Sequence, residues 1–391
     1  MEGVSFSLND ENQFSEVSFL CEKAVQDGVF PGCIVSVSQG GKELYKSAFG
    51  FKSVIRDKDD TPQPVELSTI FDISSLTNVF VTTTIIMRLV QNNRLSLDDK
   101  VSRFIQGFAV NGKSGVTIRQ LLNHSSGLAS SVPFYEELVK LNEGERRGIL
   151  TSSGARDYIF NSINRSQLKF EPGTKQVYSD VGFLLLGFLI EIVTGMRLAR
   201  AAQQYVFQPL GLKSTSFIDL AMVRRGGIHP VKDIIAPTEN CEWRGHLLCG
   251  EVFDDNAWAM GGVAGNSGVF CNQSDLHTFA CQILKSYNGQ GDFIRPDVLQ
   301  EFLKRPDSLP SDGWACGWER PNKDNLLSDS KLSENAIGFD SVTGCSLWLE
   351  PLRGIDIVLM SNRVHPSRAN KKIRNFRPVL IDAILSALEK L

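Results

Sequence analysis

The chain has 391 residues, of which 42% are hydrophobic and 22% charged, as expected of a soluble globular protein with a substantial core. Its net charge of −3 gives no reason to expect nucleic acid or an acidic membrane surface as a partner. The eight cysteines are scattered without a Cys-x-x-Cys pair, so the sequence predicts no metal site, no cofactor and no disulfide framework, and buried free thiols are the simpler interpretation.

The start of the chain shows no targeting signal. Residues Met1–Asp10 are acidic and lack a basic segment followed by an apolar one, so no signal peptide is predicted. The longest apolar run, Val181–Ile190, is about half the ~20 residues that a membrane-spanning helix requires. We therefore expect a cytoplasmic protein without a membrane partner.

In chain order, the first elements are a helix and a hairpin. Residues Phe14–Asp27 have helical periodicity and end at Gly28. The runs Cys33–Ser38 and Glu43–Ala48 alternate in polarity and are joined by Gln39-Gly40-Gly41-Lys42, which predicts a β-hairpin.

The middle of the chain is helical, and strand signals return near its end. Helices are predicted at Thr77–Gln91, Thr117–Asn123, Ala155–Asn161, Val181–Val193, Arg197–Phe207 and Arg374–Glu389, and strands at Gly268–Phe270, Ser346–Leu349 and Ile355–Met360. The pattern predicts one α/β unit over residues 1–391. In it, residues 1–70 and 245–391 form the sheet part, and residues 71–244 form a helical subdomain.

Ser75 lies where a polar turn leads into a buried helix. A residue three places further along a helix lies on the same face, and hydrolases that use Ser-x-x-Lys place an amine there to take the serine proton. Here that residue is Asn78, which cannot accept a proton at neutral pH. Because serine is also a preferred residue at helix starts, the residues alone favour a capping role for Ser75.

Six phrases along the chain resemble, in their expected order, those of the serine β-lactamase, penicillin-binding protein and class C-like esterase superfamily. They are Phe71–Leu89, Leu95–Val101, Thr117–Leu128, Pro172–Thr174 with Tyr178–Asp180, Gly261–Gly265 and Thr343–Trp348. The resemblance covers about residues 15 to 390. It implies an α/β (α+β) fold with an antiparallel sheet flanked by helices, a helical subdomain, and a cleft between the two.

The resemblance assigns roles to the site residues one by one. Ser75 matches the nucleophile, and Asn78 stands in place of the lysine. Tyr178 matches the tyrosine that acts as base in class C-like enzymes, and Asp180 takes the place of the asparagine in Tyr-x-Asn. The nucleophile and tyrosine are therefore kept, while the lysine is lost.

The third element of the family is a Lys/His-Thr-Gly strand that binds the substrate carboxylate. It falls on Phe339-Asp340-Ser341, or in a rival register on Val342-Thr343-Gly344, and either register loses the cation. We expect Asp340 and Ser341, together with Asn78 and Asp180, to contact substrate. A solvated acid at the strand end is an equal alternative for Asp340.

These changes predict a weakened catalytic site. Tyr178 would act as a phenolate, and its pKa near 10 would have to fall, which a neighbouring lysine normally achieves. Asn78 supplies no charge, and if Asp180 and Asp340 both face the cleft, they would oppose ionisation of the phenol. The leading hypothesis is a degenerate hydrolase that binds a small-molecule or peptide ligand in its cleft. The alternatives are an active esterase or peptidase on cell-wall-type fragments with Ser75 as nucleophile, and a structural scaffold without a ligand.

Two further features of the sequence are interpreted without a catalytic role. His124 is expected to organise a turn and not to catalyse. The basic residues near the end of the chain are expected to form a solvated helix face, with a phosphate-binding patch as the alternative. They are Arg363, Arg368, Lys371, Lys372, Arg374 and Arg377.

Overall fold

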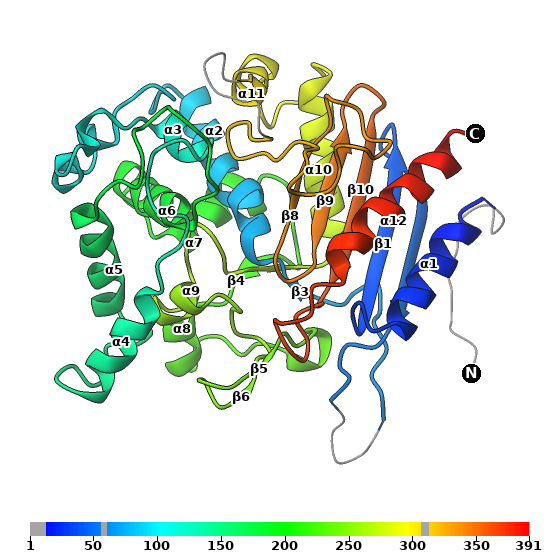
Figure 1. Cartoon of the computed structure of the whole chain (residues 1–391), viewed down its shortest axis with the longest axis horizontal. Coiled ribbons are helices and arrows are strands. Elements are labelled where there is room, and N and C mark those ends of the chain that lie inside the picture. Colours follow the sequence, from blue (N-terminus) through cyan, green and yellow to red (C-terminus); the bar gives the residue numbers. More distant parts are fainter. Residues whose placement is uncertain (1–12, 56–60, 306–312, 391) are drawn as a thin grey trace.

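The computed structural model describes residues 13–55, 61–305 and 313–390 and contains a central antiparallel sheet (Figure 1). Its five strands run in the order β2-β1-β10-β9-β8. They are β1 (Gly32–Gln39), β2 (Lys42–Gly50), β8 (Ile337–Asp340), β9 (Ser346–Glu350) and β10 (Ile355–Ser361). The central pairing joins the two ends of the chain, because Ile34 of β1 lies opposite Met360 of β10. The predicted mixture of helices and an antiparallel sheet is confirmed, whereas the subdomain boundaries at 70/71 and 244/245 stay a prediction.

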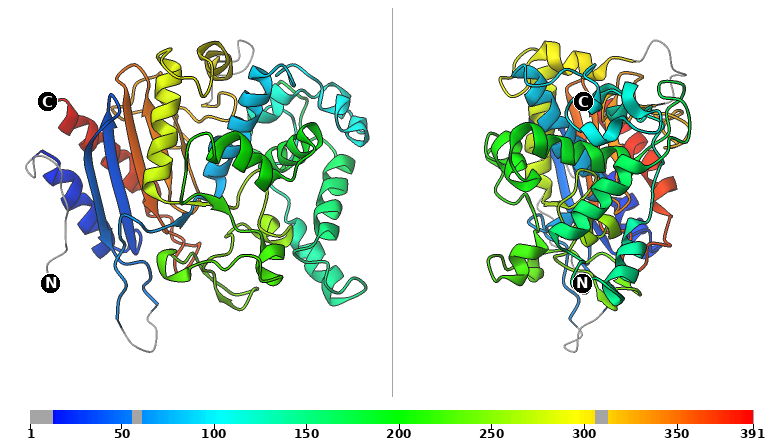
Figure 2. Two further views of the ribbon diagram at one scale, coloured as in Figure 1. Left: turned by 180° about the vertical axis from the view of Figure 1, so that it is seen from behind. Right: turned by 90° about the vertical axis from the view of Figure 1, so that its left-hand side faces the viewer.

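Helices cover both faces of this sheet. Helices α1 (Ser15–Gln26) and α12 (Ile373–Leu388) lie side by side on one face, and α10 (Gln273–Tyr287) lies on the other (Figures 1 and 2). Side chains of β10 alternate between the two layers, as in any strand. Ile357 packs with the α1–α12 layer, whereas Val358 packs with the core shared by α10.

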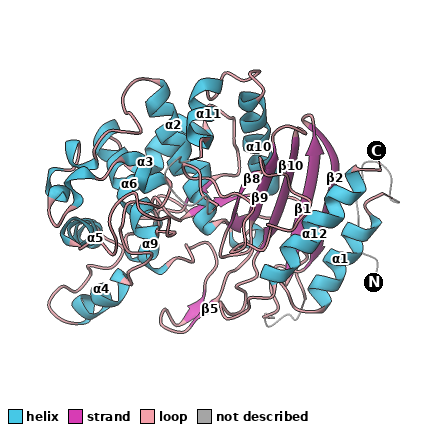
Figure 3. Ribbon diagram, turned by 45° about the horizontal axis from the view of Figure 1, so that its top comes forward, coloured by secondary structure: helices cyan, strands magenta, loops and turns pink. Residues whose placement is uncertain are grey.

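The remaining helices gather beside the sheet (Figure 3). They are α2 (Thr84–Gln91), α3 (Ile118–Leu122), α4 (Phe134–Glu143), α5 (Ser153–Arg165), α6 (Asp180–Thr194), α7 (Leu198–Ala202), α8 (Leu220–Arg224), α9 (Asp255–Ala259) and α11 (Pro296–Leu303). Short 3₁₀ or π turns are η1 (Ser74–Leu76), η2 (Asn78–Thr83), η3 (Val101–Arg103), η4 (Gln106–Ala109), η5 (Lys113–Gly115), η6 (Gln203–Phe207) and η7 (Lys232–Ile234). Minor strands are β3 (Phe71–Asp72), β4 (Ser216–Phe217), β5 (Asn240–Cys241), β6 (His246–Leu247) and β7 (Val269–Cys271).

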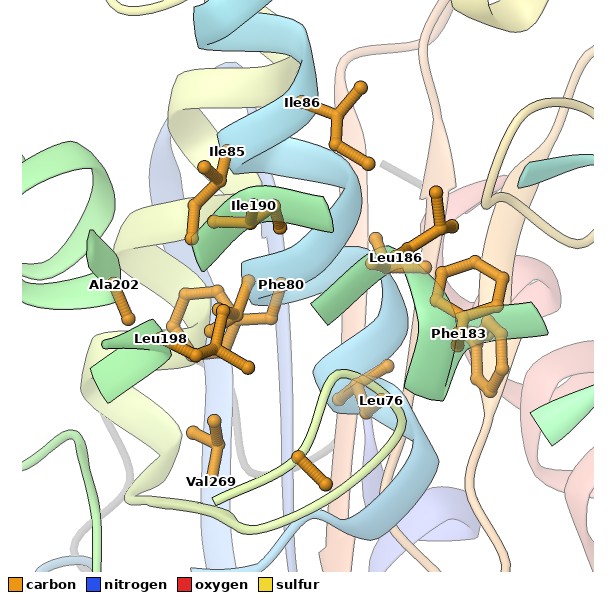
Figure 4. Packing of buried hydrophobic residues seen from close by; sticks show 14 of the residues in the cluster. Leu76, Phe80, Ile85, Ile86, Phe183, Leu186, Ile190, Leu198, Ala202 and Val269 are labelled. Atoms are coloured by element: carbon orange, nitrogen blue, oxygen red, sulfur yellow. The ribbon is translucent and has the colours of Figure 1, made fainter. Parts of the chain in front are cut away.

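The main core lies where η2 and α2 cross α6. Leu76 of η1 and Phe80 of η2 belong to the same buried cluster as Phe183 and Leu186 of α6 (Figure 4). The crossing is tight at Gly265, where an added Cβ would lie 2.1 Å from the Phe183 carbonyl oxygen. The helix that follows Ser75 is therefore packed against several neighbouring segments. This packing fixes the position of the residues at its start.

Most predicted elements are found close to their expected bounds. The hairpin turn has positive φ at both Gly40 (61°) and Gly41 (81°), a conformation that glycine adopts without strain. The segment predicted as one helix over Thr77–Gln91 is instead a π turn followed by α2. Within the described residues, no single helix is long and apolar enough to cross a membrane. The segments Asp180–Thr194 and Leu198–Phe207 together meet this test by length and composition, but with a bend of 76° between them.

Candidate active site

A strained turn sets the position of Ser75. The buried carboxylate of Asp72 accepts a hydrogen bond from this turn. Ser74 has a left-handed φ of 44°, and its N–H donates to Asp72 Oδ1 at 2.8 Å. The other Asp72 oxygen accepts from the N–H of Phe253 at 2.6 Å, so the carboxylate joins this turn to the 251–254 loop. Burial raises the pKa of Asp72 to about 7, against the opposing effect of these two hydrogen bonds. No side chain caps η1, so the capping interpretation of Ser75 is wrong.

Asn78 begins the π turn η2 and is completely buried. Its amide nitrogen donates to Tyr178 Oη at 3.2 Å, so the residue that replaces the lysine does contact the tyrosine. Its side-chain oxygen Oδ1 is buried without a hydrogen-bond partner in the described part of the chain. A short π turn often occurs at a functional site, because it re-aims side chains within a helix. Asn78 thus contacts the tyrosine hydroxyl without supplying a charge.

Tyr178 lies just before helix α6, where the local sequence fixes the chain. Ser179 is the N-cap of this helix, and its hydroxyl accepts from the N–H of Gly182 at 3.0 Å. The phenol of Tyr178 donates to Asp180 Oδ1 at 2.8 Å. Ser75, Tyr178 and Asp180 are all partly exposed, so the site reaches solvent through them.

The surroundings keep the Tyr178 phenol protonated. Burial raises the pKa of Tyr178 well above its usual value of 10, and the charge of Asp180 and the hydrogen bond to it add to the rise. Hydrogen bonds from Asn78 and Ser75 favour the phenolate but do not prevail. The Ser75 hydroxyl is therefore within hydrogen-bonding reach of the tyrosine hydroxyl.

Asp180 is part of a small acidic group. Burial raises its pKa to about 7 and the charge of Asp254 adds to this, while hydrogen bonds with Tyr178 and Asn266 lower it. Asp254 is the N-cap of α9 and accepts from the N–H of Ala257 at 2.7 Å. The groups around Asp180 are a second carboxyl, a phenol and an amide, and none of these carries a positive charge.

Aromatic rings surround Tyr178. The centroid of its ring lies 4.7 Å from that of His124, 5.5 Å from that of Trp314 and 6.4 Å from that of Phe339. Burial lowers the pKa of His124 to about 3, so the imidazole is neutral. Its Nδ1 accepts from the N–H of Ser179 at 3.1 Å, which supports the predicted turn-organising role.

Strand β8 brings Phe339, and not Asp340, to the tyrosine. Successive side chains point to opposite faces of a strand. Asp340 accordingly accepts from the Trp348 indole at 3.1 Å, and the Nε of Arg377 lies 3.5 Å from its carboxylate. Ser341 is buried, and its hydroxyl is paired with that of Thr343 at 2.8 Å. Substrate contact by Asp340 and Ser341 stays a prediction, one that this placement does not favour.

Two arginines of the basic run hold the β8–β9 turn. The Nη2 of Arg377 donates to the carbonyls of Ser341 and Cys345, at 2.8 and 3.1 Å. The Nε of Arg363 donates to the carbonyl of Val342 at 2.5 Å. Both arginines are buried, so the interpretation as a solvated helix face is wrong for these two.

Two cavities lie away from this site, on the helical part of the molecule. They measure about 420 and 530 Å³, and Arg156, Glu191 and Arg197 line both. Neither is lined by Ser75 or Tyr178. The candidate active site is therefore defined by its side-chain network and not by these hollows.

The family model described as Beta-lactamase matches residues 20–378. The chain belongs to the Beta-lactamase family. This assignment confirms the resemblance drawn from the six sequence phrases, and it makes the chain a member of a family of serine hydrolases. The sheet flanked by helices is the fold expected of this family.

Relatives of this Beta-lactamase family member include enzymes named for cell-wall chemistry. The N-acetylmuramyl-L-alanine amidase of Bacillus subtilis (strain 168) is 29% identical over 90% of this chain and 81% of its own length. A putative D-alanyl-D-alanine carboxypeptidase of Escherichia coli (strain K12) is 28% identical over 86% of this chain and 79% of its own. The octameric penicillin-binding protein homologue from Pyrococcus abyssi has a similar fold, with a TM-score of 0.68 and 20% identity over 96% of this chain and 77% of its own.

Sequence reasoning brought Ser75, Asn78, Tyr178 and Asp180 together correctly as neighbours. It missed Asp72, Asp254 and Trp314, which the structure adds to the site of this family member together with Asn266. Asp72 had a local signal, because an aspartate two residues before Ser74 is typical of a side chain that accepts from the following backbone. Asp254 and Trp314 come from distant segments, and no local pattern marks them.

Proposed function

We propose that this chain uses the Ser75 site mainly to bind a ligand and that it hydrolyses acyl compounds slowly at most. The observation that carries the proposal is the state of Tyr178. Asn78 faces its hydroxyl at 3.2 Å in place of an ammonium group, and the hydroxyl proton is directed to Asp180 at 2.8 Å.

This arrangement is expected to slow the transfer of the Ser75 hydroxyl proton to a base. A serine hydroxyl needs a neighbouring base, and general-base catalysis contributes roughly 10²- to 10⁴-fold. Because the pKa of Tyr178 is raised well above 10, the phenolate is scarce at neutral pH. We therefore expect Ser75 to react more slowly by about this factor than the serine of an intact site.

The polar groups of the site favour a ligand that donates hydrogen bonds. The side-chain oxygens of Asn78 and Asn266 are buried without partners, and Asp180 and Asp254 add carboxyl oxygens. The partly exposed rings of Tyr178 and Trp314 offer aromatic faces to a cation. With Phe339, or in the rival register Val342, where relatives carry a cation, a free carboxylate on the ligand finds no such partner. A small molecule or peptide with an amine or amide end fits this surface better than one with a carboxylate end.

A second candidate is an active hydrolase, and the Tyr178–Asp180 contact favours it. Ser75 Oγ would attack a carbonyl carbon and pass its proton to Tyr178 Oη, while the phenol proton moves to Asp180 Oδ1. A carboxyl with a pKa of about 7 is matched to proton exchange near neutral pH. In this reading Asp180 replaces the lysine as the final proton acceptor.

One experiment separates the two candidates. The wild-type protein, Ser75→Ala, Tyr178→Phe and Asp180→Asn are treated with a fluorophosphonate probe, and adduct formation is followed by intact mass. The binding proposal predicts slow labelling of Ser75 that changes less than about threefold in Asp180→Asn. Rapid labelling that Ser75→Ala abolishes and Asp180→Asn slows by 100-fold or more would refute it and establish the proton relay.

Ligand preference is tested with a matched pair of peptides. D-alanyl-D-alanine and its C-terminal amide are compared by thermal shift, because a ligand at about 100 times its Kd stabilises the protein by ~2.7 kcal/mol. The amide is expected to raise the Tm at lower concentration, and Trp314→Ala should weaken its binding. A stronger effect of the free acid would contradict the preference. No shift with either peptide would favour a scaffold without this class of ligand.

A further inference from the structure

A second cluster of reactive side chains lies far in sequence from Ser75, between α10 and the central sheet. His277 and Cys281 are one turn apart on α10 and therefore share a face of this helix. Asp356 comes from the middle strand β10, on which α10 packs (Figures 1 and 2). Among the described residues, these three form the one group of histidine, cysteine and acidic side chains whose ligand atoms all lie within 4.8 Å of one another.

The spacing of the three donor atoms is close to that around a tetrahedral ion. Zn²⁺ binds histidine nitrogen and carboxylate oxygen at about 2.0–2.2 Å and thiolate sulfur at about 2.3 Å, which separates neighbouring ligand atoms by roughly 3.3–3.6 Å. Here His277 Nδ1 lies 2.9 Å from Asp356 Oδ1 and 3.7 Å from Cys281 Sγ. Cys281 Sγ lies 3.9 Å from Asp356 Oδ2. The two distances to Asp356 involve different oxygens of its carboxylate, and the donor atoms of the three residues all lie within 4.8 Å of one another. Shifts of roughly half an ångström to one ångström would bring them to coordination distance.

The surroundings of these three side chains also suit the binding of a metal ion. Asp356 is fully buried, and the Ser38 hydroxyl donates to its Oδ2, which holds the carboxylate in place. The side chain of His277 is 18% exposed and Cys281 is partly exposed, so an ion and a water molecule can enter from solvent. Three protein ligands with an accessible fourth position are typical of zinc sites that keep a bound water.

We propose that His277, Cys281 and Asp356 form a binding site for a thiophilic divalent metal ion such as Zn²⁺. The combination of thiolate, imidazole and carboxylate selects such an ion over Mg²⁺ or Ca²⁺, which prefer oxygen ligands. The ion would tie helix α10 to the middle of the sheet, on the side away from α1 and α12. It is separate from the Ser75 chemistry and does not depend on the proposed function.

The test uses Co²⁺ as a spectroscopic probe on the reduced, chelator-treated full chain. Wild-type protein is expected to take up one equivalent, with intense visible bands of a tetrahedral ion and a near-ultraviolet band from thiolate ligation, and Zn²⁺ should displace both. Cys281→Ser should lose the thiolate band and bind at least about 100-fold more weakly. Cys249→Ser is the matched control, because Cys249 is the other partly exposed cysteine in the described residues and its thiol donates to the backbone carbonyls of Lys232 and Ile235.

A second measurement needs no variant. Zn²⁺ should slow alkylation of Cys281 by iodoacetamide in the wild-type protein, as read by peptide mass, while Cys249 keeps its rate. The proposal is overturned if wild-type protein takes up no Co²⁺, if the thiolate band persists in Cys281→Ser, or if Zn²⁺ leaves the alkylation of Cys281 unchanged. Any of these results would leave His277 and Asp356 as an ion pair with a neighbouring thiol.

Discussion

Replacing Asn78 by lysine tests whether the missing amine is what limits Ser75. The amide nitrogen of Asn78 lies 3.2 Å from Tyr178 Oη, so a lysine ammonium at this position would come within about 4 Å of the phenol oxygen. At that distance and an effective dielectric constant of ~20, a phenolate is stabilised by about 4 kcal/mol, which corresponds to ~3 pKa units.

Burial opposes part of this gain. Asn78 is completely buried, and removing an ammonium from water costs several kcal/mol unless its neighbours compensate. Asp180, hydrogen-bonded to the same phenol, provides some of that compensation. We therefore expect the pKa of Tyr178 to fall by about one to three units and the reactivity of Ser75 to rise by about 10- to 1,000-fold.

The assay is the second-order rate of fluorophosphonate labelling between pH 7 and 9, read by intact mass. Asn78→Gln is the matched control, because it lengthens the side chain without adding charge. Ser75→Ala and Tyr178→Phe, each placed in the Asn78→Lys background, should abolish the gain. The reasoning is refuted if Asn78→Lys remains folded at the assay temperature and labels no faster than Asn78→Gln.

Three further predictions concern stability, measured by urea unfolding. Burial raises the pKa of Asp180 to about 7, so the folded state keeps a proton that the unfolded state releases near pH 4, and stability contributed by this group is lost as the pH rises from about 4 to 7. Asp180→Asn should flatten this decline by about 1–4 kcal/mol, and an unchanged profile would contradict the raised pKa. Gly265→Ala should cost about 1–3 kcal/mol or more, because its Cβ would meet the Phe183 carbonyl, whereas Gly115→Ala, with open space around it, should be near neutral. Thr117→Ala should cost about 1 kcal/mol by removing the capping box of α3, and no loss would show that the cap contributes little.

The regular elements could be predicted because local periodicity survives in the folded chain. The hairpin of β1 and β2 and helix α6 were visible from alternation, glycines and apolar spacing alone. The relation of Asn78 to Tyr178 followed from motif order, even though the helix starts as a π turn. The face of the sheet on which the Asp340 side chain lies could not be predicted. Strand β8 has only four residues, and its pairing with β9 decides which of its side chains lie on each face.

Other site features depend on contacts between distant segments. Asp254 acts on Asp180 from a loop more than 70 residues away in sequence, and only the fold brings the two carboxyls together. The same holds for His277 and Asp356, which are 79 residues apart in sequence and are brought together by the packing of α10 on β10. Buried polar clusters of this kind are assembled by topology and leave no periodic signal.

The pairing of β1 with β10 also sets when the sheet can be completed during synthesis. Strands β1 and β10 can pair only after Met360, about 325 residues beyond Ile34, has been synthesised. Until then the β1–β2 hairpin has an unsatisfied edge made of buried-type residues such as Val35 and Val37, which is a template for wrong pairing. Closing so long a loop costs little extra entropy, but the pairing forms slowly. The edge of β1 therefore stays unpaired during most of the synthesis of the chain. A ribosome that stalls before β10 would release a chain with two half-sheets, each with an open edge, and such a product is a natural target for chaperones and proteases.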